Sequence, residues 1–295
     1  MTQVAVVAHA RKSLGGGLAE LRAALARAGV TDPIWHEVTK SKQAPKRARA
    51  ALDAGADIVL VWGGDGTVQR CIDAIAGSGA TIGILPAGTA NLLATNLGVP
   101  KDLESALAIA LSGTRRKLDI GTLNGERFAV MAGCGFDALM IRDADRGLKD
   151  RFGRAAYIWS GARNLRMNVV KARVKVDGET WFKGRLSCVL IGNVGRLFGG
   201  IEAFGNASPD DGRLNLGIIT ATNPVQFART FGRAAFGRAD RSPFVRMTMA
   251  RRIDVRLERK LPYELDGGAR KARKRLRIEI EPGAISVAVP NGTHS

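Results

Sequence analysis

The first 112 residues alternate between short continuous apolar runs and longer stretches whose apolar residues recur with helical spacing. The apolar runs have the length of buried strands, and they are Val4–Ala8, Ile34–Val38, Ile58–Trp62 and Thr81–Leu85. The stretches with helical spacing are Leu18–Ala28, Ala44–Ala54, Val68–Ala76, Leu92–Leu97 and Asp102–Leu111. Because strands that alternate with helices at this spacing pair in parallel, the pattern predicts a mostly parallel sheet covered on both faces.

From Gly113 onward the pattern is that of short strands separated by turn residues. Asn124-Gly125 and Asp177-Gly178 each stand between two apolar runs and predict hairpins. The expected strands are Leu118–Leu123, Arg127–Ala132, Lys171–Val176, Thr180–Lys183, Leu186–Gly192, Arg213–Ile219, Ile253–Leu257, Arg275–Ile280 and Ala284–Val289, with helices at about Gly153–Leu165 and Pro224–Phe236. The fold class is therefore expected to be α/β, with a doubly wound, mostly parallel sheet domain over residues 1–118 and a β-rich sandwich domain over residues 119–295, whose last strand could return to the first domain.

The strand Ile58–Trp62 runs directly into Gly63-Gly64-Asp65-Gly66-Thr67, and a helix is predicted immediately afterwards. A strand, a tight glycine turn and a helix start leave backbone N–H groups unpaired and directed at one spot, which is an arrangement that binds phosphate. Asp65, expected to face solvent, would repel a bare phosphate, so a metal ion between carboxylate and phosphate is expected. The alternative is an ordinary turn, since Asp-Gly dipeptides are common turn formers.

A second strand–turn–helix unit follows, in which Thr81–Leu85 ends in Pro86-Ala87-Gly88-Thr89-Ala90-Asn91. Two such units in succession would place both turns at the carboxyl edge of one parallel sheet, where open α/β sheets bind ligands. Other phosphate motifs do not fit, because the chain has no Gly-x-x-x-x-Gly-Lys-[Ser/Thr] sequence and Gly15-Gly16-Gly17 is followed by Glu20 where a dinucleotide fingerprint needs glycine. The two glycine turns together therefore favour a phosphate site of another kind.

The pair Gly-Gly-Asp-Gly-Thr and Pro-Ala-Gly-Thr-Ala-Asn resembles the catalytic domain of the diacylglycerol kinase family, and the order of motifs matches over nearly the whole chain. That family includes soluble bacterial lipid kinases and is related to sphingosine kinases and, more distantly, to NAD kinases. The resemblance implies a phosphotransferase that uses ATP and Mg²⁺ and transfers the γ-phosphate to a lipid hydroxyl, with diacylglycerol as the first candidate and phosphatidate as its product. It also implies a cytoplasmic protein, peripheral at the membrane, that meets its lipid substrate at the inner membrane face.

Applied residue by residue, the resemblance implies an ATP-binding set and a metal-binding set. The ATP-binding residues would be Thr39, Gly63, Gly64, Asp65, Gly66, Thr67, Val68, Gln69 and Thr89. The metal ligands would be Asp65 and Asp119 at the nucleotide, with Ser208, Asp211 and the carbonyl of Arg213 around a second, structural magnesium. Thr39 could equally be a threonine at a strand end, Asp119 a hairpin-edge carboxylate, and Asp211 part of a plain Asp-Gly turn.

The segment Tyr263-Glu264-Leu265-Asp266-Gly267-Gly268 resembles the Leu-Asp-Gly-Glu motif of the family. Asp266 would be catalytic, together with Asp65, as the general base that accepts the proton of the attacking hydroxyl, although a hairpin Asp-Gly turn is the alternative. Three departures stand out. Gly268 replaces the acid of the motif, Leu92-Leu93 stand where the family often has Asp-Phe, and His9-Ala10-Arg11 begin the first loop in place of Asn-Pro-x-Ser-Gly. These changes bear on substrate identity and rate more than on nucleotide binding.

The net charge of +18 is unevenly spread, because residues 1–118 carry 14 basic and 9 acidic side chains whereas residues 119–295 carry 31 and 18. The densest run, from Arg270 to Arg277, predicts attraction to an anionic membrane surface, with a solvated strand or turn as the alternative. Aromatic residues make up 5% and do not alternate with the basic runs, so no nucleic-acid partner is expected. The cysteines Cys71, Cys134 and Cys188 fit buried thiols in a reducing compartment.

Two further functions stay open beside the diacylglycerol kinase hypothesis. One is a kinase that acts on another hydroxyl compound, such as a sphingoid base, a prenol-type lipid or a nucleotide. The other is a non-catalytic homologue that binds nucleotide or lipid, for which Leu92 and Gly268 are the supporting departures. Bound ATP without transfer to any hydroxyl would identify the non-catalytic homologue. The assembly could be a homodimer.

Overall fold

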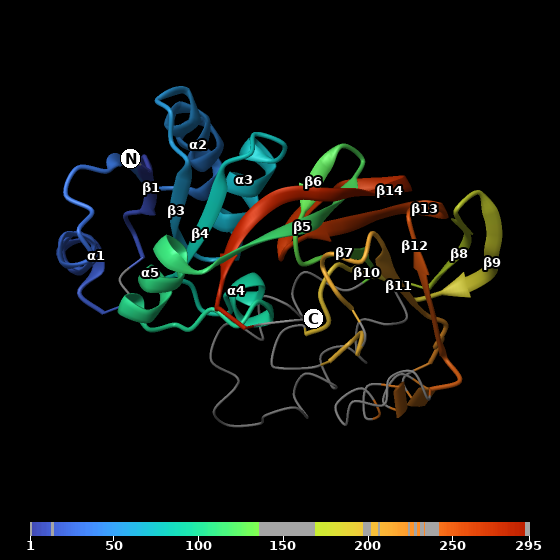
Figure 1. The fold of residues 1–295 in the computed structure, drawn as a ribbon. Coiled ribbons are helices and arrows are strands. Elements are labelled where there is room, and N and C mark those ends of the chain that lie inside the picture. The colour runs from blue at the N-terminus through green and yellow to red at the C-terminus, as the bar shows by residue number, and fades with distance from the viewer. Residues whose placement is uncertain are drawn as a thin grey trace. The chain divides into compact units, whose positions relative to one another are not determined.

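The computed structural model describes residues 2–12, 15–135, 169–196, 202–205, 207–223, 225–226, 229–230, 233 and 242–292 (Figure 1). The helix expected at Gly153–Leu165 lies outside the described residues, as does most of the helix expected at Pro224–Phe236. The chain forms two compact units. The first consists of residues 1–120 with 282–295, and the second consists of residues 121–281.

The first unit is a parallel sheet with helices on both faces, as the alternating pattern predicts. Its elements are β1 (Val4–His9), α1 (Gly17–Arg27), β2 (Ile34–Val38), η1 (Ser41–Gln43), α2 (Ala44–Asp53), β3 (Ile58–Gly63), α3 (Asp65–Ile75), β4 (Thr81–Pro86), α4 (Leu92–Asn96) and α5 (Leu103–Ser112). The strands lie in the order β4-β3-β1-β2 with every pair parallel, and every residue of β1, β3 and β4 is buried.

The strand order determines which face of the sheet each helix covers. The chain moves from β1 to β2 in one direction along the sheet and then from β2 through β3 to β4 in the other, so right-handed crossovers place α1 on one face and α2 and α3 on the opposite face. Accordingly, α2 packs beside α3 and α1 packs beside α5 (Figure 1). Asp102 caps α5, since its carboxylate accepts a hydrogen bond from the Ser105 N–H.

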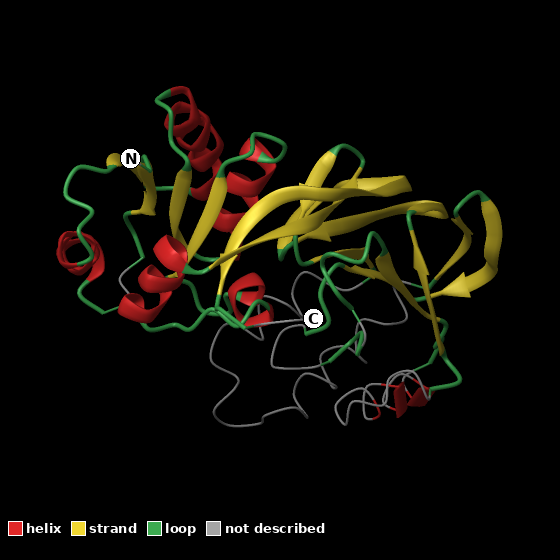
Figure 2. Cartoon of the chain, viewed as in Figure 1, coloured by secondary structure: helices red, strands yellow, loops and turns green. Residues whose placement is uncertain are grey.

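The second unit is an antiparallel β structure, and Figure 2 shows that its described part consists mainly of strands. Its elements are the end of β5 (Thr114–Leu123), β6 (Glu126–Phe128), β7 (Met131–Cys134), β8 (Val170–Val176), β9 (Glu179–Leu186), β10 (Cys188–Gly192), β11 (Leu214–Ile219), β12 (Val245–Ala250), β13 (Arg252–Leu265) and most of β14 (Gly268–Val289). The strands lie in the order β12-β11-β10-β7-β13-β14, and the β8–β9 hairpin pairs with β13. One apolar core fills one side of these strands.

Both predicted hairpin turns are present, but several strands differ from expectation, since the sequence pattern does not predict β12 and β13 continues to Leu265 beyond the expected end at Leu257. Asn124 and Asp177 adopt the left-handed conformation that such turns need. The expected strand Arg127–Ala132 is instead split into β6 and β7, because the backbone N–H groups around Val130 bond to a side chain and leave the ladder. The strands expected at Arg275–Ile280 and Ala284–Val289 are one continuous strand, β14.

Candidate functional site

The two glycine turns lie side by side at the carboxyl edge of the parallel sheet in the first unit. β3 and β4 pair in parallel up to Gly63 and Pro86, and the Ala87 N–H donates to the Gly63 carbonyl at 2.9 Å. A Cβ atom added to Gly88 would come within 2.5 Å of the Gly64 Cα. The two turns thus touch backbone to backbone, and only glycine allows that approach.

Asp65 connects the two turns. It is the first residue of α3, and its carboxylate accepts a hydrogen bond from the Leu92 N–H at 2.5 Å, where α4 begins. Burial raises the pKa of this carboxyl, and backbone hydrogen bonds from Leu92 and Leu93 oppose that rise. The expectation that Asp65 only faces solvent is therefore wrong, because the side chain also positions the start of α4.

The second turn is held by its own asparagine. Asn91 is buried in a left-handed conformation, its amide donates to the Gly88 carbonyl at 2.7 Å, and its carbonyl oxygen accepts from the Gly88 N–H at 2.9 Å. The Nζ atom of Lys101 lies 3.5 Å from the carbonyl oxygen of Thr89 and brings a cation to this turn. Sequence reasoning missed Lys101, although a basic residue directly after Val99-Pro100 could have been noticed.

The other residues expected at the nucleotide lie at the same edge or inside α3. Thr39 follows β2, whose carboxyl end shares this edge, and its hydroxyl donates to the side-chain Oε1 of Gln43 at 3.2 Å. The Thr67 hydroxyl lies 3.0 Å from that of Ser41. Thr67, Val68 and Gln69 are buried in α3, whereas Gly66 and Thr89 are exposed.

The residues expected to bind metal have protein partners of their own. Asp119 is buried in β5 and accepts a hydrogen bond from the Gly283 N–H at 2.8 Å. In the second unit, the Asp211 carboxylate accepts from the Arg213 N–H at 2.8 Å, and the Ser208 hydroxyl donates to Asp210. Among the described residues, no group of three or more His, Cys, Asp or Glu side chains could hold a metal ion. The ligand sets stay predictions.

Asp266 lies in the second unit, in the turn between β13 and β14. It is buried with φ at 46°, and its carboxylate accepts the backbone N–H groups of Ala129, Val130 and Met131 at 2.8, 2.9 and 2.8 Å. Three donors stabilise a negative charge on these oxygens and set the orientation of the carboxylate. The Asp-Gly turn offered as the alternative is present, yet this carboxylate also holds a distant segment of the chain.

Glu264 is a second carboxylate of the same motif that sequence reasoning passed over. It is buried in β13, opposite Gly133 in β7 and Ala269 in β14, and its Oε1 atom has no hydrogen-bond partner. Burial, together with the nearby charge of Asp266, raises the pKa of Glu264 to about 8. The pattern of Tyr263, Glu264 and Leu265 could not reveal its burial, because alternation along a strand turns Glu264 to the face opposite the two core residues and so predicts exposure.

The raised pKa of Glu264 predicts that the contribution of this residue to folding stability decreases as the pH rises. The pKa of Glu264 is above its ordinary value in the folded state, so the unfolded chain releases this proton at a lower pH than the native chain does. The contribution of Glu264 to stability should be fully present below its ordinary pKa of 4.5 and should be lost as the pH rises to about 8. The expected loss between pH 5 and pH 7 is about 2 to 3 kcal/mol in the free energy of unfolding.

Urea unfolding of wild type and Glu264→Gln across this pH range measures the effect. Glu264→Gln should remove most of the pH slope, because glutamine does not titrate. Glu258→Gln is the matched control, since Glu258 is exposed on the same strand. Equal slopes for wild type and Glu264→Gln would show that Glu264 does not carry the effect.

The structure shows the surroundings of Leu92 and Gly268, the two positions where the motifs lack an acid. The side chain of Leu92 is buried, so this position contributes only its backbone N–H to Asp65. A Cβ atom added to Gly268 would lie 2.7 Å from the Nη1 atom of Arg270. The Arg270 guanidinium donates to the Gly268 carbonyl at 3.0 Å and to Glu126 at 2.6 Å. Arg270 therefore occupies the space beside the position that usually holds an acid.

Comparison with known proteins covers both units. Residues 9–123 match the diacylglycerol kinase catalytic domain, and residues 130–289 match the YegS C-terminal NAD kinase β-sandwich-like domain. A Pseudomonas aeruginosa (strain UCBPP-PA14) protein named "Probable lipid kinase YegS-like" is 32% identical over 297 aligned residues, which cover 99% of this chain and 95% of the relative. The diacylglycerol kinase of Bacillus subtilis (strain 168) is 29% identical over 237 residues, 79% of this chain and 78% of the relative.

Solved structures share the fold. A crystal structure of a diacylglycerol kinase from Bacillus anthracis str. Sterne matches with a TM-score of 0.78 at 21% identity, covering 99% of this chain and 98% of the other. An NAD kinase from Archaeoglobus fulgidus, in complex with ATP, matches with a TM-score of 0.53 at 13% identity, covering 98% and 94%. The chain therefore shares with these kinases an α/β N-terminal unit and a β-rich C-terminal unit.

These matches define the chain as a phosphotransferase with a hydroxyl acceptor. The chain belongs to the family of YegS-like lipid kinases and diacylglycerol kinases.

Proposed function

We propose that this protein is an ATP- and Mg²⁺-dependent lipid kinase that transfers the γ-phosphate of ATP to a lipid hydroxyl, with diacylglycerol as the first acceptor. The observation that carries the proposal is the backbone contact between the turns at Gly64 and Gly88, with Asp65 bonded across them. Phosphoryl transfer depends mainly on positioning and charge stabilisation, and these turns offer backbone N–H groups and one carboxylate at a sheet edge.

The residues of the first unit fit a nucleotide phosphate. A Cβ atom on Gly88 would fill the space between the two turns, whereas one on Gly66 would meet nothing within 4 Å. The Thr67 and Val68 N–H groups donate to the Gly64 carbonyl, so in the first turn of α3 the Gly66 N–H is the group that would donate to a phosphate oxygen. Thr89 and Thr39 would add hydroxyl contacts. Asp65 would hold Mg²⁺, which when bound neutralises charge on the phosphates.

The residues of the second unit would provide the general base for the acceptor hydroxyl and the ligands of a structural metal ion. Asp266 would accept the proton of the attacking hydroxyl, and three backbone donors fix the orientation of its carboxylate. Ser208, Asp211 and the Arg213 carbonyl would hold a structural magnesium, because a hydroxyl, a carboxylate and a carbonyl are the oxygen ligands that this ion takes.

The enzyme would act from the cytoplasm, as a peripheral protein at the inner face of the membrane. None of the helices in the described part of the chain is both long and apolar enough to cross a bilayer. The basic balance of residues 119–295 supports attraction to an anionic lipid surface.

A non-catalytic homologue is the second candidate, and the settings of Leu92 and Gly268 favour it. Neither position supplies a carboxylate, because the residues are leucine and glycine. Leu92 is buried in the core, and the Arg270 side chain lies against Gly268. Such a protein would bind ATP at the glycine turns and transfer nothing.

One assay separates the candidates. Purified protein is incubated with γ-labelled ATP, Mg²⁺ and mixed micelles that contain diacylglycerol, a sphingoid base or a prenol, and the products are separated by chromatography. We expect label on the diacylglycerol, in amounts that depend on Mg²⁺. Label on another hydroxyl compound would change the acceptor. ATP binding without label on any acceptor would contradict kinase activity.

A further inference from the structure

Exposed cations cover the outward side of four neighbouring strands in the second unit, and we call this surface the basic face. It lies on β14, β13, β8 and β9, whose alternate residues Val255, Leu276 and Val174 point into the core. The exposed cations of the basic face are Lys171, Arg173, Lys183, Arg185, Arg252, Arg256 and Arg277, and the half-buried Lys175 and Arg275 also lie on it. On these strands, the described carboxylates that share the face are Asp254, Glu258 and Glu279.

One row of the sheet places cation opposite cation across all four strands. Arg275 stands opposite Arg256, Arg256 opposite Arg173, and Arg173 opposite Lys183. Like charges directly opposite each other destabilise a sheet. A surface that keeps such a row is suited to a polyanionic partner, whose binding would relieve the repulsion.

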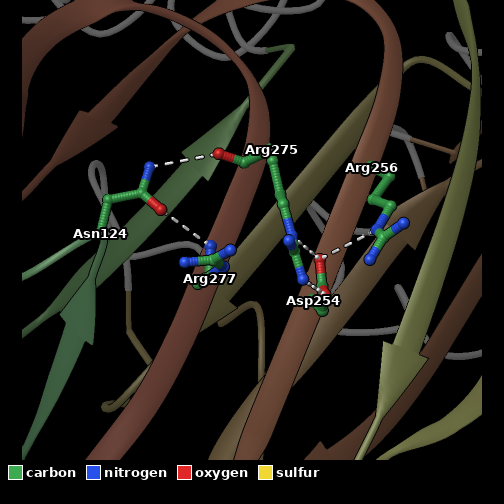
Figure 3. A network of polar contacts seen from close by, with 5 residues as sticks. All are labelled: Asn124, Asp254, Arg256, Arg275 and Arg277. Carbon is green, nitrogen blue, oxygen red and sulfur yellow. Dashed lines mark hydrogen bonds and ion pairs between the residues drawn. The ribbon is translucent and has the colours of Figure 1, made fainter.

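The acids of the face neutralise only part of this charge. Asp254 accepts hydrogen bonds from Arg275 at 3.0 and 2.5 Å and lies 3.8 Å from Arg256, as Figure 3 shows. The Arg275 guanidinium holds the pKa of Asp254 below its ordinary value, so this carboxylate stays charged. The Arg256 side chain nevertheless remains 57% exposed.

The Asn124 side chain forms hydrogen bonds with the backbone of Arg275 and Arg277. These bonds attach the β5–β6 hairpin to β14 (Figure 3).

The basic face differs from the run of charge in the sequence. Arg270 is only 14% exposed in its side chain and pairs with Glu126, so it does not join the surface. Arg173, Lys183 and Arg185, which are distant in sequence, stand on it instead. A variant that neutralises residues 270–275 would therefore break the ion pairs of Arg270 and Arg275 and still leave most of the face charged.

We propose that the basic face docks the protein onto an anionic lipid bilayer, an inference that rests on the proposed lipid acceptor. Charge complementarity supports it, since each well-placed Lys or Arg contributes about 1 kcal/mol near an anionic membrane surface. The cations spread over four strands, which suits a broad surface. The aromatic residues of β9 do not serve the face for base stacking, because Phe182 is in the core and Trp181 packs against it.

Vesicle binding tests the proposal. The variant Arg173→Gln, Lys183→Gln, Arg185→Gln, Arg256→Gln removes four cations and keeps the pair of Arg275 with Asp254. We expect its partitioning onto vesicles of two parts phosphatidylcholine to one part phosphatidylglycerol to fall roughly 100-fold or more. Wild type should bind pure phosphatidylcholine weakly and lose binding to the mixed vesicles as salt rises. If the fourfold variant does not fold, the pairs Arg173/Lys183 and Arg185/Arg256 are replaced separately.

The matched control removes the same charge from the first unit. Lys46, Arg47, Arg49 and Lys117 are exposed there, and their replacement by glutamine should change vesicle binding less than threefold or so. Equal losses for both variants, or wild-type binding by the face variant, would overturn the proposal. A wild-type protein that binds a DNA duplex through this face but not the mixed vesicles would overturn it as well.

The same variants separate docking from catalysis. Transfer to a short-chain, water-soluble diacylglycerol should be equal in wild type and the face variant, because that acceptor needs no bilayer. If wild type transfers phosphate to no lipid, but the face variant still binds vesicles more weakly than wild type does, the proposed function fails and the docking proposal stands. If transfer is intact and the face variant still binds vesicles, only the docking face fails.

Discussion

We expect Asp266→Asn to lower the rate of phosphoryl transfer at saturating ATP by roughly 100- to 10,000-fold, the usual contribution of a positioned general base. Asparagine tolerates the left-handed conformation of this turn, so the backbone should be preserved. ATP affinity should change little, because Asp266 and the glycine turns belong to separate units. Steady-state kinetics with varied ATP, together with ATP titration of the inactive variant, measures both quantities.

The three backbone bonds of Asp266 require a structural control. In Asp266→Asn the amide group would face one of the N–H groups of Ala129 to Met131, so a stability loss of about 1 to 3 kcal/mol is also expected. Asp177 offers the matched variant, because it occupies a left-handed Asp-Gly turn and accepts the N–H groups of Arg251 and Arg252. Asp177→Asn should cost stability and leave the rate unchanged.

Two results would remove Asp266 from the base role. If Asp177→Asn lowers the rate as much as Asp266→Asn does, the effect is one of folding. If Asp266→Asn loses ATP binding and keeps its rate at saturating ATP, Asp266 serves the nucleotide, and the base must be sought elsewhere. Asp119 would then be the next candidate, although it is buried and bonded to the Gly283 N–H.

The second large effect is expected at the glycine turns. Asp65→Ala should lower phosphoryl transfer by roughly 100- to 1,000-fold, because it removes one element of charge stabilisation at the phosphates. The structure adds a second consequence, since the Leu92 N–H loses its acceptor and the start of α4 should loosen. Losing such a cap costs about 1 kcal/mol, so the variant should still fold.

Asp102→Ala is the control for that second consequence. Asp102 caps α5 in the same unit and accepts the Ser105 N–H, so its loss should affect stability and not the rate. Circular dichroism and thermal unfolding of both variants establish that they fold. A folded Asp65→Ala protein with wild-type activity would exclude Asp65 from the site.

The fold of the first unit could be predicted from the sequence because its signals are local. β3 is an apolar run that ends at Gly63, β4 is one that ends at Pro86, and parallel pairing places these two ends at one edge. The hydrogen bond from the Leu92 N–H to Asp65 joins residues 27 positions apart, so the local pattern of apolar and polar residues does not predict it. For that reason the motif residues could be named while the second role of Asp65 could not.

The second unit was less predictable because its polar contacts are distant in sequence. The break between β6 and β7 depends on Asp266, 137 residues from Ala129. Within β14, the Gly283 N–H donates to Asp119, which is 164 residues away in the chain. Likewise the basic face joins Arg275 to Arg173 and Lys183 through strand register, which hydropathy and charge runs do not encode.

The decisive measurement is the stoichiometry of transfer from γ-labelled ATP to dioctanoylglycerol in mixed micelles, with ADP and labelled lipid counted in the same reaction. We predict one labelled phosphatidate for each ADP formed, with no product when Mg²⁺ is chelated and little with Asp65→Ala. ADP release without labelled lipid, or labelled lipid formed equally well by Asp65→Ala, would contradict a lipid kinase built on the two glycine turns.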